Sequence, residues 1–251
     1  MQFALVLARI AGLFMTAPIF KTRSLFTLAK VAMMLWVTVL FWCVMPAPAH
    51  LPASSFTFTL AILNELMIGL IIGFAADMVL VGLEFGGNII DAQMGLSTGQ
   101  TLDPTSGNSV TIMAQFLRWG GIMIFFIVNG HHMVLQGIAR SFTLLPLGQP
   151  VNFTEASQYI VSLAGSIFMI GTQIAMPIIL VIFFMDFALG MISRVAPQVN
   201  VFQLGFEIKP AVGAVIFMLM TPYLFGSIAP LVAQRFENML EVMMALSQKL
   251  L

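Results

Sequence analysis

Long apolar runs without a charged residue dominate the pattern along this chain. They extend over residues 31–64, 119–139, 156–185 and 210–234. Each run reaches or exceeds the roughly 20 residues that a helix needs to cross a bilayer. The strands of a membrane β-barrel would alternate polar and apolar side chains, and these runs do not. The pattern therefore predicts an all-α membrane protein, with helices over about 3–20, 25–45, 56–98, 109–145, 155–194 and 210–249.

Proline and basic residues add detail to this pattern. Pro177 and Pro222 lie inside two of the longest predicted helices and are expected to kink or divide them, which predicts long broken helical hairpins. The positive-inside tendency assigns a side of the membrane to each end of the second predicted helix. Residues 21–30, with three basic side chains, are expected on the cytoplasmic side, and the uncharged, proline-rich residues 46–55 on the outer side.

Composition supports the membrane assignment and excludes several functions. Of the 251 residues, 60% are hydrophobic and 8% are charged, whereas a soluble domain has about a quarter charged residues. A single cysteine, Cys43, excludes an internal disulfide and a cysteine-based metal site. The net charge of zero provides no basic surface for nucleic acid. No basic segment precedes the first apolar residues, so no cleavable signal peptide is expected.

Glycines are concentrated between residues 69 and 99. Pairs with GxxxG spacing allow close backbone contact between helices in a membrane. They can serve a densely packed assembly of several chains, or the internal packing of one bundle. The pairs are Gly69/Gly73, Gly82/Gly86 and Gly95/Gly99.

Three acidic residues, Asp77, Glu84 and Asp91, follow one another at intervals of seven in this glycine-rich helix. The spacing places them along one side of the helix. Each would cost roughly 2.5–3.5 kcal/mol if ionised in lipid. They could form an ion or proton pathway, or pair with basic residues of a neighbouring subunit in a wet assembly. Alternatively, this helix does not lie at membrane depth.

Other polar residues stand alone in apolar surroundings. Glu65, Arg118 and Asp186 are each expected to find an ion-pair partner, on this chain or on another one. For the adjacent pair His131 and His132, a turn or interfacial position is favoured over metal binding, because neighbouring side chains diverge by about 100° on a helix and no cysteine or carboxylate flanks them closely.

Two polar segments interrupt the apolar pattern. Residues 96–116 contain turn signals at Asp103-Pro104 and Ser106-Gly107. Irregular backbone at membrane depth is tolerated only where protein or an aqueous cavity surrounds it, so this segment is either an exposed loop or a plug whose apolar end obstructs a pore. Residues 194–209, "RVAPQVNVFQLGFEIK", separate the last two apolar stretches.

In sequence the chain resembles the FliR family, the R-type export gate subunit of flagellar type III secretion. The resemblance covers nearly the whole length and rests on the order and spacing of several motifs. The chain begins closer to the first motif than is usual in that family, so a few N-terminal residues are expected to be absent. The motifs are "ARIAGLFMTAPIF" near the start, "NELMIGLIIGF" at 64–74, "GQTLDP" at 99–104, "NGHH" at 129–132, "LLPLG" at 144–148 and "RVAPQVNVFQLGFEIK".

The resemblance implies an architecture and a set of partners. The chain would form a single export-gate membrane domain over residues 1–251, with a FliP-like part over about 1–150 and a FliQ-like hairpin over about 151–251. Family members assemble with about five FliP and four FliQ subunits per FliR at the entrance of the secretion channel, largely raised above the plane of the inner membrane. The hairpin would meet the FlhB switch protein on the cytoplasmic side.

The resemblance also assigns roles to residues. A pore plug loop would contain Asp103, Pro104, Gly107, Val110, Met113 and Phe116. A cytoplasmic gate loop from 197 to 209 would contain Gln198, Asn200, Phe202, Gln203, Glu207 and Lys209. Intersubunit or buried charges would be Glu65, Asp77, Glu84, Asp91, Arg118 and Asp186.

These inferences lead to a non-enzymatic subunit, without cofactor or metal, of the flagellar protein export gate in the bacterial inner membrane. With FliP and FliQ it would form the channel for unfolded flagellar proteins, in contact with membrane lipid. An injectisome export subunit of the same fold is the alternative within this class. A secondary transporter that uses Asp77, Glu84 and Asp91 is the alternative from a different class.

Overall fold

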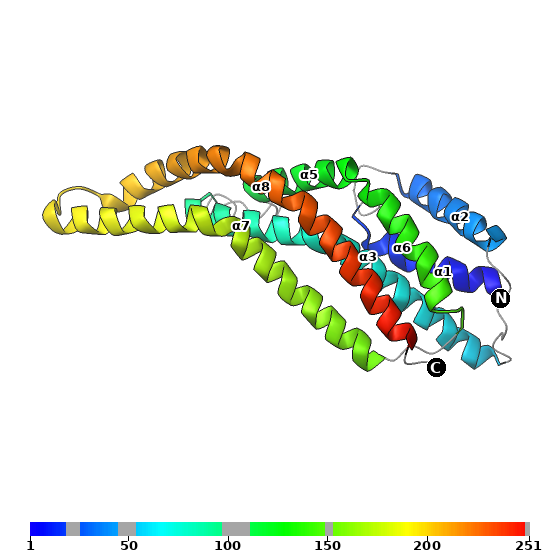
Figure 1. Cartoon of the computed structure of the whole chain (residues 1–251). Helices are drawn as coiled ribbons and strands as arrows, with labels where there is room; N and C mark the ends of the chain where they lie inside the picture. Colours follow the sequence, from blue (N-terminus) through cyan, green and yellow to red (C-terminus); the bar gives the residue numbers. More distant parts are fainter. Residues whose placement is uncertain (19–25, 45–53, 97–110, 149–152, 249–251) are drawn as a thin grey trace. The chain divides into compact units, whose positions relative to one another are not determined.

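The computed structural model describes residues 1–18, 26–44, 54–96, 111–148 and 153–248. These residues form helices and no strand, so the predicted all-α class is confirmed (Figure 1). The helices are α1 (Gln2–Thr16), α2 (Thr27–Val44), α3 (Ser55–Met94), α5 (Ile112–Ile127), α6 (Gly130–Leu144), α7 (Phe153–Val195) and α8 (Val201–Gln248).

Four of these helices are long and apolar enough to cross a membrane. They are α2, α3, residues 161–195 of α7 and residues 201–228 of α8, and the bent pair α5–α6 adds a fifth if it is counted as one span. The protein is therefore an all-α membrane protein, as the apolar runs predict.

The positions of the helix breaks differ from the prediction. α7 and α8 continue through Pro177 and Pro222, so these prolines do not divide their helices. Packing around a membrane helix can compensate the backbone hydrogen bond that a proline removes. The predicted helix 109–145 is instead two helices. They separate at Asn129, whose backbone is left-handed (φ 60°).

The start of α8 also corrects the predicted boundary. α8 begins at Val201, nine positions before the predicted start at 210. The side chain of Asn200 accepts a hydrogen bond from the backbone N–H of Gln203 (3.3 Å), which is the usual capping interaction at a helix start. Only 196–200 therefore connect α7 to α8, and Gln203, Glu207 and Lys209 lie in a helix rather than in a loop.

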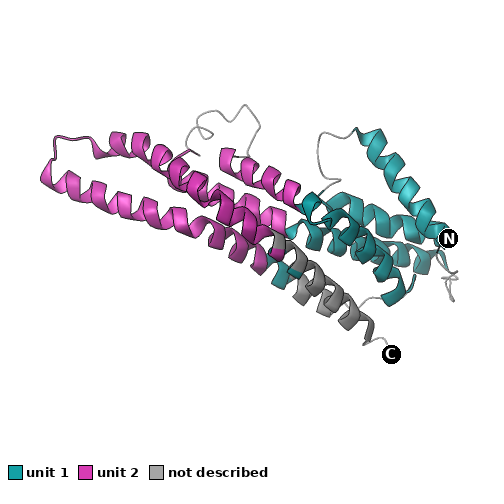
Figure 2. Cartoon of the chain, turned by 45° about the horizontal axis from the view of Figure 1, so that its top comes forward, with its two compact units in different colours: residues 1–78, 125–164, 231–251 teal, residues 79–124, 165–230 magenta. Residues whose placement is uncertain are grey.

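The chain divides into two compact units, coloured separately in Figure 2. Unit 1 contains residues 1–78, 125–164 and 231–251, and unit 2 contains residues 79–124 and 165–230. Because α3, α7 and α8 each contribute residues to both units, neither unit corresponds to one continuous half of the sequence.

In unit 1, glycines bring the backbones of α1 and α3 into contact. A Cβ atom at Gly69 would collide with the carbonyl oxygen of Arg9, and a Cβ atom at Gly12 with that of Leu66. The Thr16 hydroxyl lies 3.2 Å from the carbonyl oxygen of Leu70 in the same interface. The surrounding core is aliphatic and includes Leu5, Val6, Ile10, Leu13, Ile68, Ile72, Val134 and Ile138.

In unit 2, glycines on the second half of α3 contact two further helices. A Cβ atom at Gly86 would lie 2.8 Å from the carbonyl oxygen of Gly171 on α7, and one at Gly87 would collide with Ala114 on α5. The pairs at 69/73 and 82/86 thus serve packing within one chain. Gly95 has φ +76° and lies just past the end of α3, and Gly99 lies outside the described residues.

The α1–α3 contact yields a direct test. Gly69→Ala is expected to lower the thermal denaturation midpoint of the detergent-solubilised protein, because the added methyl meets backbone atoms that cannot rotate away. Overpacking of this kind costs about 1–3 kcal/mol. Gly165→Ala on α7 is the control. A Cβ atom there has nothing within 4 Å, and alanine favours a helix over glycine by up to about 1 kcal/mol. Equal midpoints for both variants would contradict the close contact.

Candidate functional site

A charged side chain in α1, Arg9, is completely buried at 0% exposed. Its Nε lies 2.6 Å from a carboxylate oxygen of Glu65 on α3. Its other nitrogens donate to the Ser141 hydroxyl (3.2 Å) and to the carbonyl oxygen of Leu145 (3.0 Å). The guanidinium also lies 4.4 Å from the ring centroid of Phe142. One side chain therefore joins α1, α3 and α6.

Glu65 extends this network to the segment after α6. Its second oxygen accepts a hydrogen bond from the backbone N–H of Gly148 (3.0 Å). Glu65 was expected to have an ion-pair partner on this chain or on another one, and its partner is Arg9 on the same chain. Sequence reasoning did not select Arg9 as a site residue, although a lone cation in an apolar helix is a detectable signal.

A second set of polar contacts joins α3 to α5. Glu84, one of the three acids at seven-residue intervals, forms an ion pair with Arg118, which was predicted as an isolated charge. About two turns further along α3, the buried carboxylate of Asp91 accepts hydrogen bonds from the backbone N–H groups of Met113 (2.9 Å) and Ala114 (3.3 Å). Asp77, the third acid of the predicted stripe, is 2% exposed.

The two described residues of the predicted plug, Met113 and Phe116, lie in the first two turns of α5. With residues of α8 they line an almost wholly apolar pocket of about 490 Å³. The Phe116 ring packs 5.5 Å from that of Phe217 and 6.2 Å from that of Phe225. The other predicted plug residues, Asp103, Pro104, Gly107 and Val110, lie outside the described residues.

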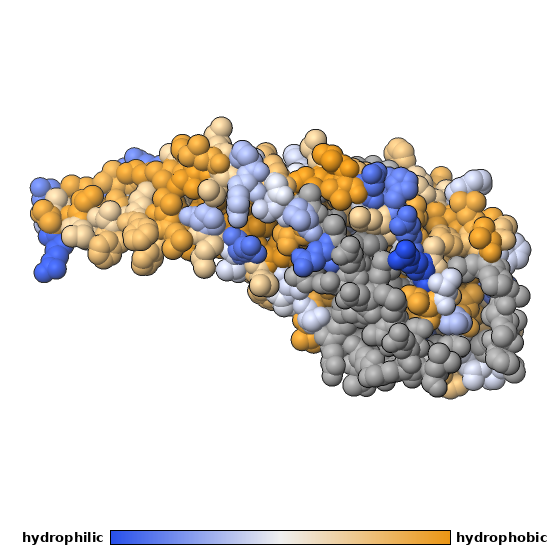
Figure 3. Space-filling view, in the orientation of Figure 1, coloured by the Kyte–Doolittle hydropathy of each residue, from blue (hydrophilic) through white to orange (hydrophobic). Residues whose placement is uncertain are grey.

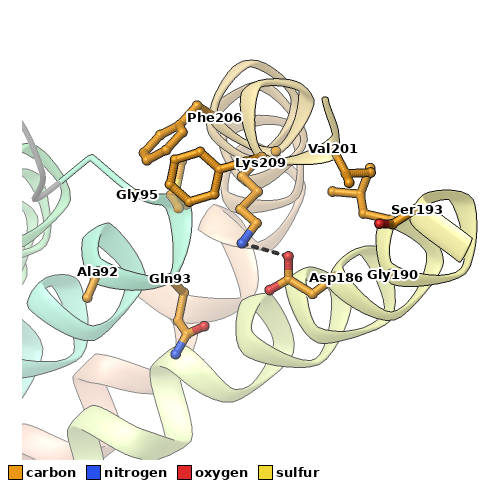
Figure 4. A pocket seen from close by; sticks show the side chains of 13 residues that line it. Ala92, Gln93, Gly95, Asp186, Gly190, Ser193, Val201, Phe206 and Lys209 are labelled. Atoms are coloured by element: carbon orange, nitrogen blue, oxygen red, sulfur yellow. Dashed lines mark ion pairs between the residues drawn. The ribbon is translucent and has the colours of Figure 1, made fainter. Parts of the chain in front are cut away.

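The third ion pair joins the two arms of the α7–α8 hairpin. Lys209 Nζ lies 2.6 Å from Asp186 Oδ1, as Figure 4 shows. The pair borders a pocket of about 490 Å³ between the hairpin and the end of α3, with Phe202 and Phe206 in its wall. Gln198 and Asn200 are exposed at the hairpin turn, and the Gln203 side-chain amide donates to Glu207 (3.4 Å).

The surface of this hairpin combines apolar and charged side chains. Figure 3 shows it largely hydrophobic, with hydrophilic residues at the tip. The exposed apolar side chains include Phe168, Phe183, Phe184, Phe187, Met191 and Phe202. Such a surface is suited to burial against other protein, since lipid would not match its charges and water would not match its phenylalanines.

The adjacent histidines lie in the first turn of α6, directly after the turn at Asn129, rather than in the turn itself. The ring centroids of His131 and His132 are 4.3 Å apart. Within the described residues, no group of three or more histidine, cysteine, aspartate or glutamate side chains could hold a metal ion.

Fold and site together define an all-α membrane protein whose helices are joined by internal ion pairs and close glycine contacts. The model of the family "Bacterial export proteins, family 1" matches residues 1–236, and the chain belongs to this family. It is similar to the flagellar biosynthetic protein FliR of Bacillus subtilis (strain 168), with 28% identity over 240 residues, which covers 94% of this chain and 92% of that protein.

Two further relatives show the range of the family. The flagellar biosynthetic protein FliR of Pectobacterium carotovorum subsp. carotovorum is 29% identical over 246 residues, which covers 98% of this chain and 94% of the relative. The Yop proteins translocation protein T of Yersinia pestis is 29% identical over 181 residues, which covers 70% and 69% of the two chains.

The buried and the half-exposed ion pairs should differ sharply in their effect on stability. Glu65→Gln leaves the Arg9 charge buried without its counter-ion, and such a loss costs about 3–5 kcal/mol. Lys209→Met breaks a pair whose side chains are 26% and 45% exposed, and exposed pairs contribute about 0–1 kcal/mol. We therefore expect a large fall in the thermal denaturation midpoint for Glu65→Gln and a small one for Lys209→Met.

The double variant Arg9→Met, Glu65→Leu is the matched control for this comparison. It removes both charges together, and replacement of a buried ion pair by apolar residues is often neutral. Its midpoint is expected to lie above that of Glu65→Gln. A midpoint below that of the single variant would show that packing, and not the unpaired charge, dominates.

Proposed function

We propose that this chain is a non-enzymatic subunit of a type III protein export gate in the bacterial inner membrane, within the flagellar basal body. In this proposal it forms, with FliP and FliQ subunits, the channel through which unfolded flagellar proteins cross the membrane. Membership of an export family supports the proposal, as do relatives named flagellar biosynthetic protein FliR that match over nearly their whole length.

The observation that carries the proposal is the α7–α8 hairpin. Only 33% of the apolar window in α7 and 22% of that in α8 are buried within the chain. The same surface includes Asp186, Glu207 and Lys209, none of which is buried. An ionised group facing lipid costs roughly 2.5–3.5 kcal/mol, so neighbouring protein subunits are the environment that suits this hairpin best.

The proposed partners follow from the same hairpin and from the family resemblance. About five FliP and four FliQ subunits would surround one copy of this chain, and FlhB would meet the turn at Gln198 and Asn200. In this proposal residues up to about 150 are FliP-like and the rest form a FliQ-like hairpin. This division is based on resemblance to FliP and FliQ, whereas the two compact units are defined by packing within this chain.

A secondary transporter is less well supported by the site. Glu84 is paired with Arg118, and Asp91 accepts hydrogen bonds from the start of α5. Neither of the two pockets described above is lined by Asp77, Glu84 or Asp91. An injectisome export subunit is the second candidate, favoured by the similarity to a Yop translocation protein.

In the proposed channel, Met113 and Phe116 obstruct the closed pore. Apolar bulk at a constriction keeps a narrow pore dry and closed to ions. Both side chains project into an apolar pocket rather than into the tightly packed core. Phe116 is 45% exposed within this chain, so it remains accessible to a pore or to a partner.

The plug is tested in the co-expressed, purified complex. Met113→Gly, Phe116→Gly should leave a particle of several hundred kilodaltons intact, yet raise ion leakage through reconstituted vesicles at least about tenfold, because an unobstructed aqueous pore removes a barrier of more than 1.4 kcal/mol. Met123→Gly, Phe126→Gly is the matched control, with the same residue types and spacing on the same exposed helix. Recovery of a stable monomer alone would contradict the assembly, and equal leakage in both variants would contradict the plug.

The sidedness of the hairpin turn gives a separate test. On a Cys43→Ser background, Gln198→Cys should react with a membrane-impermeant thiol reagent only after the inner membrane is permeabilised. Ser54→Cys, which is exposed just before α3, should react from the periplasm. Labelling of Gln198→Cys from the periplasm of intact cells would contradict a cytoplasmic turn.

A further inference from the structure

We propose that Asp91 is a positioning residue of the export channel, which holds the first two turns of α5 and thereby sets the place of Met113 and Phe116. The inference rests on the proposed function, in which these two side chains obstruct the pore. It assigns to Asp91 a role distinct from an ion pathway and from pairing with a basic residue of another subunit.

The first observation is the geometry of the carboxylate. Asp91 lies in the last turn of α3 and is 0% exposed. Its Oδ2 accepts hydrogen bonds from the N–H groups of Met113 and Ala114, at 2.9 Å and 3.3 Å. The first N–H groups of a helix have no partner within the helix, and their partial positive charge favours a carboxylate. A side chain of α3 thus caps α5, so the cap is a tertiary contact.

Two further contacts between α3 and α5 lie on the same helix faces as this cap. The Thr111 hydroxyl donates to Asn88 Oδ1 (3.0 Å). Gly87 lies against the backbone of Ala114, where a Cβ atom would be 2.9 Å from the carbonyl carbon of Met113.

The ion pair Glu84–Arg118 completes the series. Residues three and four positions apart share a helix face, so one face of α3 meets one face of α5 over two turns. We name this set the α3–α5 clamp; it consists of Glu84, Gly87, Asn88 and Asp91 with Thr111, Met113, Ala114 and Arg118.

Asp91 holds the end of the clamp at which α5 begins. Glu84–Arg118 fixes α5 about two turns inside the helix, where loss of one contact would leave the helix hydrogen bonds intact. Asp91 instead accepts from two backbone N–H groups in the first turn of α5, which have no acceptor within the helix itself, while its own Oδ1 accepts no hydrogen bond from the described residues. A buried oxygen without a partner is unfavourable. The two hydrogen bonds that Oδ2 accepts at the start of α5 offset part of this cost.

The clamp connects directly to the proposed plug. Met113 supplies one of the capped N–H groups, and Phe116 follows within the same turn of α5. Phe116 in turn packs against Phe217 and Phe225 of α8. The start of α5 is therefore braced by α3 through polar contacts and by α8 through aromatic ones. Release of the polar brace shifts the two obstructing side chains without removing them.

The test compares two substitutions of similar volume in the co-expressed complex. Asp91→Leu fills the same space without an acceptor, and Asp91→Asn keeps an oxygen that can accept the two N–H groups. We expect Asp91→Leu to raise ion leakage through reconstituted vesicles at least about fivefold while assembly is retained. Asp91→Asn should leak within about twofold of the unmodified complex. Asp91→Ala repeats the comparison with less bulk, and Asp77→Leu is the control for loss of a buried acid elsewhere on α3.

The outcomes separate this inference from the plug itself. If Met113→Gly, Phe116→Gly leaks and assembled Asp91→Leu does not, the positioning role is overturned and the plug stands. If neither leaks, the plug and the positioning role both fall. If Asp91→Leu and Asp91→Ala fail to assemble while Asp91→Asn assembles, Asp91 has a purely structural role. Equal leakage of Asp91→Asn and Asp91→Leu would also overturn the inference, because the retained acceptor would then have no effect.

Discussion

The arrangement of these helices depends on one constraint: a charge on an apolar helix needs a partner. An unpaired ion among hydrocarbon or apolar side chains is strongly unfavourable, so the few ionised groups select which helices lie together. Arg9 and Glu65 join α1 to α3, Glu84 and Arg118 join α3 to α5, and Asp186 and Lys209 join the arms of the hairpin. Apolar packing is far less selective, because most of these side chains can pack against almost any neighbour.

Glycine supplies the close approach that makes these polar contacts reachable. On α3 an acidic residue and a glycine lie one turn apart at two places: Glu65 precedes Gly69, and Gly87 precedes Asp91. At each place the partner backbone lies against the glycine, which brings it within reach of a side chain one turn away. In a membrane, where the hydrophobic effect contributes little to helix association, close contact and hydrogen bonding are the available sources of specificity.

Sequence reasoning predicted the helices better than their contacts. Apolar runs of bilayer length located most helix boundaries, because burial of apolar surface depends on composition along the chain. The predicted start of α8 was wrong, because the polar residues after Asn200 were interpreted as a loop. They form the first turns of a helix that Asn200 caps. The role of Arg9 was missed because its partners Glu65, Ser141 and Leu145 are 56, 132 and 136 positions away, and no local pattern encodes such a distance.

The same constraint distinguishes the ion pair that is fully buried within this chain from the one that remains half-exposed. Arg9 and Glu65 satisfy each other in a dry core, so they need no other subunit. Asp186 and Lys209 are paired but half-exposed, and they lie on a hairpin whose exposed apolar side chains include Phe183, Phe184, Phe187 and Phe202. Such a pair gains strength when a neighbour excludes water from it, because its Coulomb interaction grows as the local dielectric falls. Assembly would therefore stabilise the hairpin twice, through its apolar surface and through its ion pair. On this argument the Arg9–Glu65 pair is complete within unit 1, whereas the Asp186–Lys209 pair of the hairpin is the one that a neighbouring subunit would strengthen.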